Sequence, residues 1–185
     1  LSAIPVFFLF IFAEIIAVRY FNQRGSLHAK DDSVSIFMGL FSVLTNGAAA
    51  FLTLGMLVWA QQFQIYALPL TWTTLIACFV ADDLRYYLHH RIAHRCRWPW
   101  AMHIIHHSSQ RISFAVALRQ GWTKHFTGTT ILKVPLVLIG FDPLMVIFCG
   151  ALNAVYQFFL HTDTVEKLPR WVEAVFNTPS HHRVH

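Results

Sequence analysis

Residues 33–81 read SVSIFMGLFSVLTNGAAAFLTLGMLVWAQQFQIYALPLTWTTLIACFVA and contain no charged side chain. A helix rises about 1.5 Å per residue, so about 20 apolar residues cross the roughly 30 Å hydrocarbon core of a bilayer. The stretch is therefore long enough for two membrane-spanning helices. Its polar interruption, Gln61-Gln62-Phe63-Gln64, predicts the turn between them.

The composition of the whole chain agrees with a membrane protein. The chain has 185 residues, of which 56% are hydrophobic and 12% are charged, and its mean hydropathy is +0.49. Soluble domains carry about 25% charged residues, so a soluble globular enzyme is disfavoured and intrinsic disorder is excluded. The fold class expected is all-α: an integral membrane helical bundle of about four to five apolar helices under a cytosolic histidine-rich helical cap.

Two further apolar regions flank the polar segments. The first runs from Leu1 to Val18 and the last from about residue 126 to 160, where Gly140-Phe141-Asp142-Pro143 predicts the turn of a membrane hairpin. We expect one domain over 1–185, with 1–81 mainly transmembrane, 82–125 and 161–185 carrying the histidines, and 126–160 forming the hairpin. Because the chain stops within its last histidine motif, we expect it to be a fragment.

Basic residues predict the orientation of these helices. The segments 20–32 and 82–125 are rich in Lys and Arg, whereas the turn at Gln61 is neutral. The positive-inside rule then places the basic segments in the cytosol, in a multi-pass protein. The net charge of +5 is explained by these loops, so nucleic acid is not an expected partner.

Histidine is unusually abundant, with 12 residues against 9 acidic ones. On a helix that continues the third apolar segment, four polar residues at spacings of four, three and four form one stripe: Asp83, Tyr87, His90 and His94. Asp83 or Tyr87 could orient an imidazole as a neighbour of a ligand. A second helix is predicted from Trp98-Pro99, and its three histidines, His103, His106 and His107, would share one face.

A third group closes the chain, with His181, His182 and His185, while His161 stands alone after the last apolar region. Clustered imidazoles repel one another when protonated and lack partners when buried and neutral. Metal ions resolve both problems by binding neutral imidazole lone pairs. About eight candidate ligands are too many for one tetrahedral zinc and suit two metals.

The kind of metal follows from context, because imidazole suits zinc, copper, iron and nickel alike. His90 is followed by Arg91, which excludes the zinc-protease motif with its Glu in that position. Histidines clustered beyond the ends of the apolar runs disfavour haem. A metal pair at a membrane surface has access to lipid C–H bonds, whose cleavage requires redox chemistry with oxygen. Two irons fit this chemistry best.

The histidine motifs resemble those of the fatty acid hydroxylase/sterol desaturase superfamily of membrane di-iron enzymes. They read His90-Arg-Ile-Ala-His94, His103-Ile-Ile-His106-His107 and, without its last histidine, His182-Arg-Val-His185. Asp83, Tyr86-Tyr87 and Trp100-Ala-Met-His103 also look like the family. Two stretches most resemble its alkylglycerol monooxygenase-like branch: Ala117-Leu118-Arg119-Gln120 and Asn177-Thr178-Pro179-Ser180-His181-His182.

The resemblance implies O₂-dependent hydroxylation or desaturation of a fatty acyl chain, a sterol or an alkylglycerol ether lipid taken from the bilayer. Two iron ions would be held by the histidines of the three motifs and His161: His90, His94, His103, His106, His107, His161, His182 and His185. Zinc could replace iron in isolated protein, and electrons would come from a separate reductase or a pterin.

Three other residues near these motifs have open roles. Arg119 and Gln120 would contact a lipid headgroup or belong to a solvated loop, and His181 would be either a ligand or a neighbour of one. The rival interpretation of the chain is a non-redox zinc-binding membrane protein or a divalent-metal transporter. A transporter would place its ligands inside the membrane spans, near the midplane.

Overall fold

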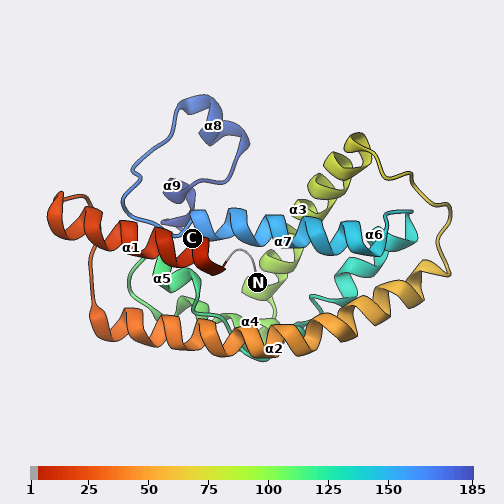
Figure 1. Cartoon of the computed structure of the whole chain (residues 1–185), viewed down its shortest axis with the longest axis horizontal. Helices are drawn as coiled ribbons and strands as arrows, with labels where there is room; N and C mark the ends of the chain where they lie inside the picture. Colours follow the sequence, from red (N-terminus) through yellow and green to blue (C-terminus); the bar gives the residue numbers. More distant parts are fainter. Residues whose placement is uncertain (1–3) are drawn as a thin grey trace. The chain divides into compact units, whose positions relative to one another are not determined.

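The computed structural model describes residues 4–185, and every regular element in that range is helical, so the all-α class is confirmed. Figure 1 labels the α-helices along the chain. The longer helices are α1 (Ile4–Tyr20), α2 (Ala29–Gln61), α3 (Trp72–Arg95), α4 (Arg97–His103) and α7 (Pro143–Phe159). The short ones are η1 (His106–Ser108), α5 (Phe114–Ala117), η2 (Lys124–Thr127), η3 (Ile131–Lys133), α6 (Val134–Leu138), α8 (Arg170–Val175) and α9 (Pro179–His182).

By length and composition, α2 is the one helix of the described range that could cross a membrane. Its 33 residues span about 50 Å at about 1.5 Å per residue. Only 11% of its most apolar 18-residue window is buried within the protein, and Leu44 and Phe51 are largely exposed. An apolar helix that leaves such side chains uncovered is suited to a lipid environment.

Membrane spans other than α2 therefore stay a prediction, and so does the expected number of about four to five apolar helices. The helices α1 and α7 have 17 residues each, and α3 is long but carries Asp82, Asp83 and Arg85 in its middle. The first three residues of the predicted run from Leu1 to Val18 lie outside the described range.

The predicted turn after Gln61 is confirmed, but the helix that follows begins later than expected. Residues 65–71 are non-helical, and α3 starts after Thr71, whose side chain accepts a hydrogen bond from the backbone N–H of Thr74. The Thr74 hydroxyl in turn accepts from the Thr71 backbone N–H, which completes a capping box. Pro69 also disfavours helix just before this cap. The uncharged part of α3 that precedes Asp82 is therefore only ten residues long, 72–81.

The predicted hairpin of 126–160 has its turn where expected, since α7 begins at Pro143. The first arm of this hairpin is not one continuous helix, because only η3 and α6 form between residues 128 and 140. Gly128 adopts a left-handed conformation that ends the preceding turn, and Pro135 lies in the first turn of α6. Gly140 has φ +119°, and a Cβ there would lie 2.6 Å from the Tyr66 carbonyl oxygen, so only glycine fits this turn.

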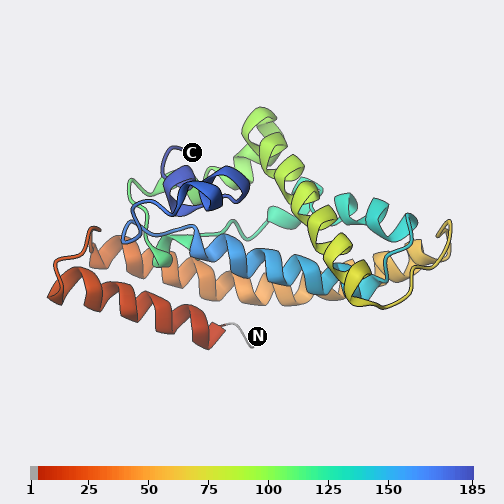
Figure 2. The same cartoon turned by 90° about the horizontal axis from the view of Figure 1, so that it is seen from above.

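The chain divides into two compact units that alternate along the sequence. Unit 1 comprises the residues up to Leu40 together with 106–120 and 155–185, and unit 2 comprises 41–105 and 121–154. In unit 1, α1 lies against α5, and their apolar side chains Ile11, Phe114 and Ala115 pack with Phe158. Figure 2 shows α8 and α9, also part of unit 1, in dark blue near the C-terminus.

Unit 2 has a separate core in which the second half of α2, α3, α6 and the first part of α7 take part. Its buried apolar side chains include Leu57, Cys78, Val137 and Cys149. Both cysteines are free thiols, and they pack in this core as small apolar residues do. The prediction of a single domain over 1–185 stays a prediction.

Candidate metal centre

Unit 2 brings three histidines together at the C-terminal end of α3. The helix continues without interruption through the first motif, as predicted, and Cys96 then adopts an extended conformation from which α4 starts. Nε2 of His94 lies 3.2 Å from Nε2 of His90 and 3.1 Å from Nε2 of His103. We call His90, His94 and His103 the hairpin group.

These distances fit coordination of one metal ion. Metal–nitrogen bonds of about 2.0–2.1 Å, at angles of about 90–110°, place neighbouring nitrogens about 2.9–3.4 Å apart. The Nε2 distances of the hairpin group fall in this range. None of the three imidazoles is fully buried.

Unit 1 brings together histidines that are far apart in the sequence. His106 lies in η1, His161 two residues after α7, and His182 at the end of α9. Nε2 of His161 is 3.0 Å from Nε2 of His106, and the ring centres of His161 and His182 are 4.1 Å apart. One ring nitrogen of each lies within 4.8 Å of the others. We call His106, His161 and His182 the buried group.

The outer nitrogens of two of these rings are bonded to backbone carbonyls. Nδ1 of His106 lies 3.2 Å from the Arg119 carbonyl oxygen, and Nδ1 of His161 lies 2.7 Å from that of Gln157. Because a carbonyl only accepts, each Nδ1 must carry the proton and donate it. In the neutral rings, Nε2 then holds a lone pair, and two lone pairs face each other across 3.0 Å. A cation bound by both nitrogens removes this repulsion.

The burial of the rings favours the neutral form that binds a metal. Burial, with a smaller contribution from neighbouring His106, lowers the pKa of His161 to about 3. Burial also lowers the pKa of His182 to about 3, helped by the charge that His161 would carry if protonated. Imidazoles with such pKa values are neutral at pH 7 and present their lone pairs without proton competition.

Two further predicted ligands lie beside the buried group. The ring of His107 is 5.2 Å from that of His106, and the ring of His185 is 5.4 Å from that of His182, centre to centre. The rings of His107 and His185 are 5.1 Å apart. Unit 1 therefore contains five of the eight predicted ligands within contact of one another.

The prediction that His103, His106 and His107 share one helix face was wrong. The helix α4 ends at His103, and residues 104–105 form a turn before η1. Ile104 and Ile105 are β-branched and weak helix formers, so little local preference opposes this break. As a result, His103 joins the hairpin group of unit 2, and His106 joins the buried group of unit 1.

Four other residues predicted to belong to the site bond elsewhere. Asp83 accepts a hydrogen bond from Asn153, the Tyr87 hydroxyl accepts one from Arg91, and the Gln120 amide donates to the Ala117 carbonyl. His181 faces Glu173, with Nε2 3.4 Å from a carboxylate oxygen. The roles of Asp83, Tyr87, Gln120 and His181 near the metals stay predictions that these contacts do not support.

One residue that sequence reasoning left aside is central to unit 1. Glu14, in the apolar helix α1, is buried and accepts two hydrogen bonds, from the Phe114 N–H at 2.7 Å and from the Thr162 hydroxyl at 2.5 Å. Thr162 follows His161 directly in the sequence, so Glu14 fixes the segment that carries this histidine. The signal was available, because a single acid within an apolar helix needs buried partners.

The fold and the two groups define a class of protein: an all-helical protein with an apolar helix and two sets of imidazoles whose ring nitrogens lie close enough together to hold metal ions. Comparison with known sequences identifies the family. The profile of the family described as fatty acid hydroxylase matches residues 75–185, the part of the chain that contains all the histidines named above. The chain belongs to this family.

The curated relatives narrow the branch. An alkylglycerol monooxygenase of Danio rerio is 33% identical over the whole chain, and the one of Homo sapiens is 32% identical over the whole chain. The alkylglycerol monooxygenase of Caenorhabditis elegans is 32% identical over 96% of the chain. The chain spans 41%, 41% and 35% of the lengths of these relatives. No solved structure matches the chain significantly.

Proposed function

We propose that this chain forms the metal-binding part of a membrane-bound, non-haem di-iron monooxygenase that hydroxylates a C–H bond of a lipid. The observation that carries the proposal is the pair of Nε2 atoms of His106 and His161, which face each other at 3.0 Å while both Nδ1 atoms are bonded to carbonyls. This arrangement has a physical reason if a cation lies between the two rings.

One iron would be held by the hairpin group and one by the buried group, with His107 and His185 as further ligands. Iron with O₂ supplies the redox chemistry that an unactivated C–H bond requires. The protein's own contribution is to keep the imidazoles neutral and oriented. The bonds to the Gln157 and Arg119 carbonyls, together with the burial of His161, do this in unit 1.

The overall reaction fixes what must be supplied from outside. One oxygen atom of O₂ enters the C–H bond as a hydroxyl group, and the other leaves as water after taking up two protons and two electrons. The electrons must come from an external donor, and a separate reductase or a pterin would serve. Desaturation would need the same oxidant and donor, so the product distinguishes the two reactions.

An alkylglycerol ether lipid is the proposed substrate, since the relatives are named for alkylglycerols. Hydroxylation of the carbon next to the ether oxygen gives a hemiacetal. The hydroxyl proton then moves to the ether oxygen as the C–O bond breaks, which yields an aldehyde and an alcohol. The uncovered apolar surface of α2 supports a location in the bilayer, from which the lipid would enter. We propose that the histidines face the cytosol.

The test is lipid analysis of cells that produce the full-length protein, fed an alkylglycerol under ¹⁸O₂. We expect a fatty aldehyde, and its oxidised acid, with the label, and two irons per chain in protein purified from membranes. The His161→Ala variant should give neither product nor full iron content. Two tightly bound zinc ions and no oxidised lipid, with electron donors present, would overturn the proposal in favour of a non-redox zinc protein.

A further inference from the structure

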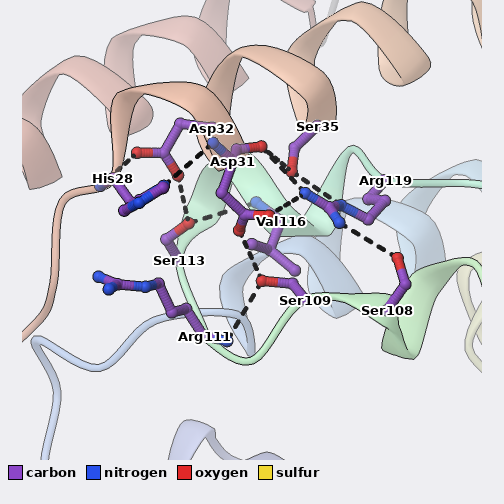
Figure 3. Close-up of polar contacts among 10 residues, drawn as sticks. All are labelled: His28, Asp31, Asp32, Ser35, Ser108, Ser109, Arg111, Ser113, Val116 and Arg119. Atoms are coloured by element: carbon purple, nitrogen blue, oxygen red, sulfur yellow. Dashed lines mark hydrogen bonds and ion pairs between the residues drawn. The ribbon is translucent and has the colours of Figure 1, made fainter.

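The segment that follows the second histidine motif ends at a buried arginine. Arg119 is 6% exposed, and each of its three guanidinium nitrogens donates a hydrogen bond within the chain. NH2 lies 2.5 Å from Oδ1 of Asp31, Nε 3.1 Å from the Ser35 hydroxyl, and NH1 3.1 Å from the Ser108 hydroxyl (Figure 3). Because no guanidinium nitrogen is left over, the geometry does not favour a lipid headgroup as its partner.

The partner carboxylate, Asp31, lies in the first turn of α2 and holds two points of one segment. Its Oδ1 accepts from Arg119, and its Oδ2 accepts from the Ser109 hydroxyl at 2.7 Å. Its backbone carbonyl accepts from Arg119 and from Ser35. The stretch from Ser109 to Arg119 is therefore fastened at both ends to a single residue of another helix, as Figure 3 shows.

The arginine in turn touches a proposed ligand through its backbone. The Arg119 carbonyl is the acceptor for Nδ1–H of His106, which is itself 8% exposed. The hydrogen bond to the outer nitrogen of a ligating imidazole fixes both its tautomer and the plane of its ring. The carbonyl can do this only while the backbone at Arg119 stays in place, and the guanidinium bonds hold it there.

A close contact between α2 and the same segment adds to this rigidity. A Cβ on Gly39 would lie 2.7 Å from Cβ and 3.1 Å from the carbonyl oxygen of Leu118, so α2 packs directly against the residue before Arg119. The position of the His106 acceptor is thus tied to α2 at three residues: Asp31, Ser35 and Gly39.

We propose that Asp31 is a positioning residue that acts through Arg119 to aim Nε2 of His106 at the metal of the buried group. This inference rests on the proposed function, because it takes His106 to be a metal ligand. It also gives the N-terminal turn of the apolar helix α2 an indirect role in the metal site, through Arg119. Removing the carboxylate leaves the buried guanidinium without its charge partner, so the backbone at Arg119 should shift and the His106 ring should lose its fixed orientation.

The test compares Asp31→Asn with Asp32→Asn in the full-length protein. Both variants remove one negative charge from the same turn, but Asp32 bonds to the His28 N–H and, at 3.5 Å, to Ser113 and not to Arg119. Co²⁺ is titrated into metal-free protein in detergent, with its visible ligand-field spectrum and bound stoichiometry as readouts. Changes at the hydrogen-bond partners of metal ligands lower affinity about ten- to hundredfold. We expect about a tenfold loss at one of two sites for Asp31→Asn, with an altered spectrum, and less than twofold for Asp32→Asn.

A second variant guards against simple misfolding. Arg119→Lys keeps the positive charge but loses the planar guanidinium with its several donors. Like Asp31→Asn, it should weaken Co²⁺ binding, but it should lower the temperature of thermal unfolding less than Asp31→Asn does. If Asp31→Asn and Arg119→Lys each bind two Co²⁺ with wild-type affinity and spectrum, the positioning role is wrong and the proposed function stands. If the wild-type protein binds no Co²⁺ or iron and His161→Ala changes nothing, the proposed function fails, and this inference fails with it.

Discussion

The two histidine groups are built in different ways. The hairpin group comes from one stretch of 14 residues, His90 to His103, in which a continuous helix and the short helix after it supply all three rings. The buried group draws on three segments separated by 55 and 21 residues. Its rings are braced by backbone carbonyls, by Arg119 and, through Thr162, by Glu14. The rings of the hairpin group are partly exposed, whereas His106 and His161 are buried. Packing between segments far apart in the sequence is needed to form the buried group but not the hairpin group.

The largest effect should follow from removing one ring from either group. We expect His94→Ala and His161→Ala each to reduce bound iron from two to one per chain, because each group would hold one ion. Product formation should fall by at least about a thousandfold, or about 4 kcal/mol in activation free energy. Iron is measured by elemental analysis of purified protein and product by mass spectrometry of lipids.

The outcome tells the two groups apart. If His94→Ala loses its iron while retaining more than about a tenth of the product, the hairpin group is not part of the reacting centre. The buried group alone would then carry the chemistry.

The next largest effect concerns a charge cluster in unit 2. Asp82 is fully buried and bonds to Arg85 Nε at 2.6 Å and to Lys133 Nζ at 3.3 Å. Removing one partner of a buried ion pair costs about 3–5 kcal/mol. We expect Asp82→Ala to lower the free energy of unfolding by about this amount, measured by denaturant titration in detergent.

This cluster provides the contrast to Asp31 in unit 1. Asp82 is bonded to other charged side chains and not to a backbone that holds a ligand, so the folded fraction of Asp82→Ala should bind Co²⁺ as the wild type does. Asp83→Asn is the matched control: Asp83 accepts a hydrogen bond of 3.3 Å from Asn153, and the substitution should cost about 1 kcal/mol. A tenfold weaker Co²⁺ site in folded Asp82→Ala would show that both units couple buried charge to metal binding.

A smaller effect is expected at Glu14, where unit 1 uses an acid from α1. In Glu14→Gln the amide oxygen can still accept from the Phe114 N–H, but the NH2 group would face the Thr162 hydroxyl, which must then accept instead of donating. Both hydrogen bonds to the side chain lose their charged acceptor, and because a bond to a charged group contributes more than a neutral one, the change should cost about 1–3 kcal/mol. We expect that loss of stability together with weaker Co²⁺ binding at one site, because Thr162 adjoins His161.

Glu166→Gln is the matched control for Glu14, since its side chain is 76% exposed and its ion pair with Arg24 spans 3.8 Å. It should change neither the unfolding free energy nor the affinity for Co²⁺. If Glu14→Gln and Glu166→Gln had the same unfolding free energy and the same affinity for Co²⁺, Glu14 would not help to position His161.

The sequence predicted the features whose cause is local. The all-α class, the turn after Gln61, the helix through His90 and His94 and the turn before Pro143 each depend on nearby residues alone. The grouping of His106 with His161 and His182 depends on how distant segments pack, and helical spacing wrongly assigned His106 to the same face as His103. The uncharged part of α3 is shorter than the charge-free run suggested, because the capping box at Thr71 makes this helix begin late. The apolar run before Gly140 forms only short helices, and Pro135 lies at the start of one of them, α6.

The pairing of Asp31 with Arg119 could not be predicted from the sequence for a related reason. Asp31 stands in a polar stretch of sequence, and a charge just before an apolar run is common at a membrane boundary. Its role becomes visible only when Arg119, 88 residues away, is placed beside it. A spacing rule cannot detect a pair of this kind, and only a covarying partner or a structure reveals it.

The smallest effect should distinguish two adjacent histidines of the third motif. The sequence treats His181 and His182 alike, but the ring of His182 lies 4.1 Å from that of His161, whereas His181 faces Glu173 and is 45% exposed. An exposed pair of this kind contributes at most about 1 kcal/mol. His181→Ala should therefore keep two irons and at least about a third of the product, while His182→Ala loses one iron and the activity.

The two variants differ by one position in the same short helix, α9, so a general disturbance of this helix would affect both equally. If His181→Ala matched His182→Ala in metal content and product, ligation would have to be reassigned to include His181, and the buried group would need a different arrangement of α9 from the one described.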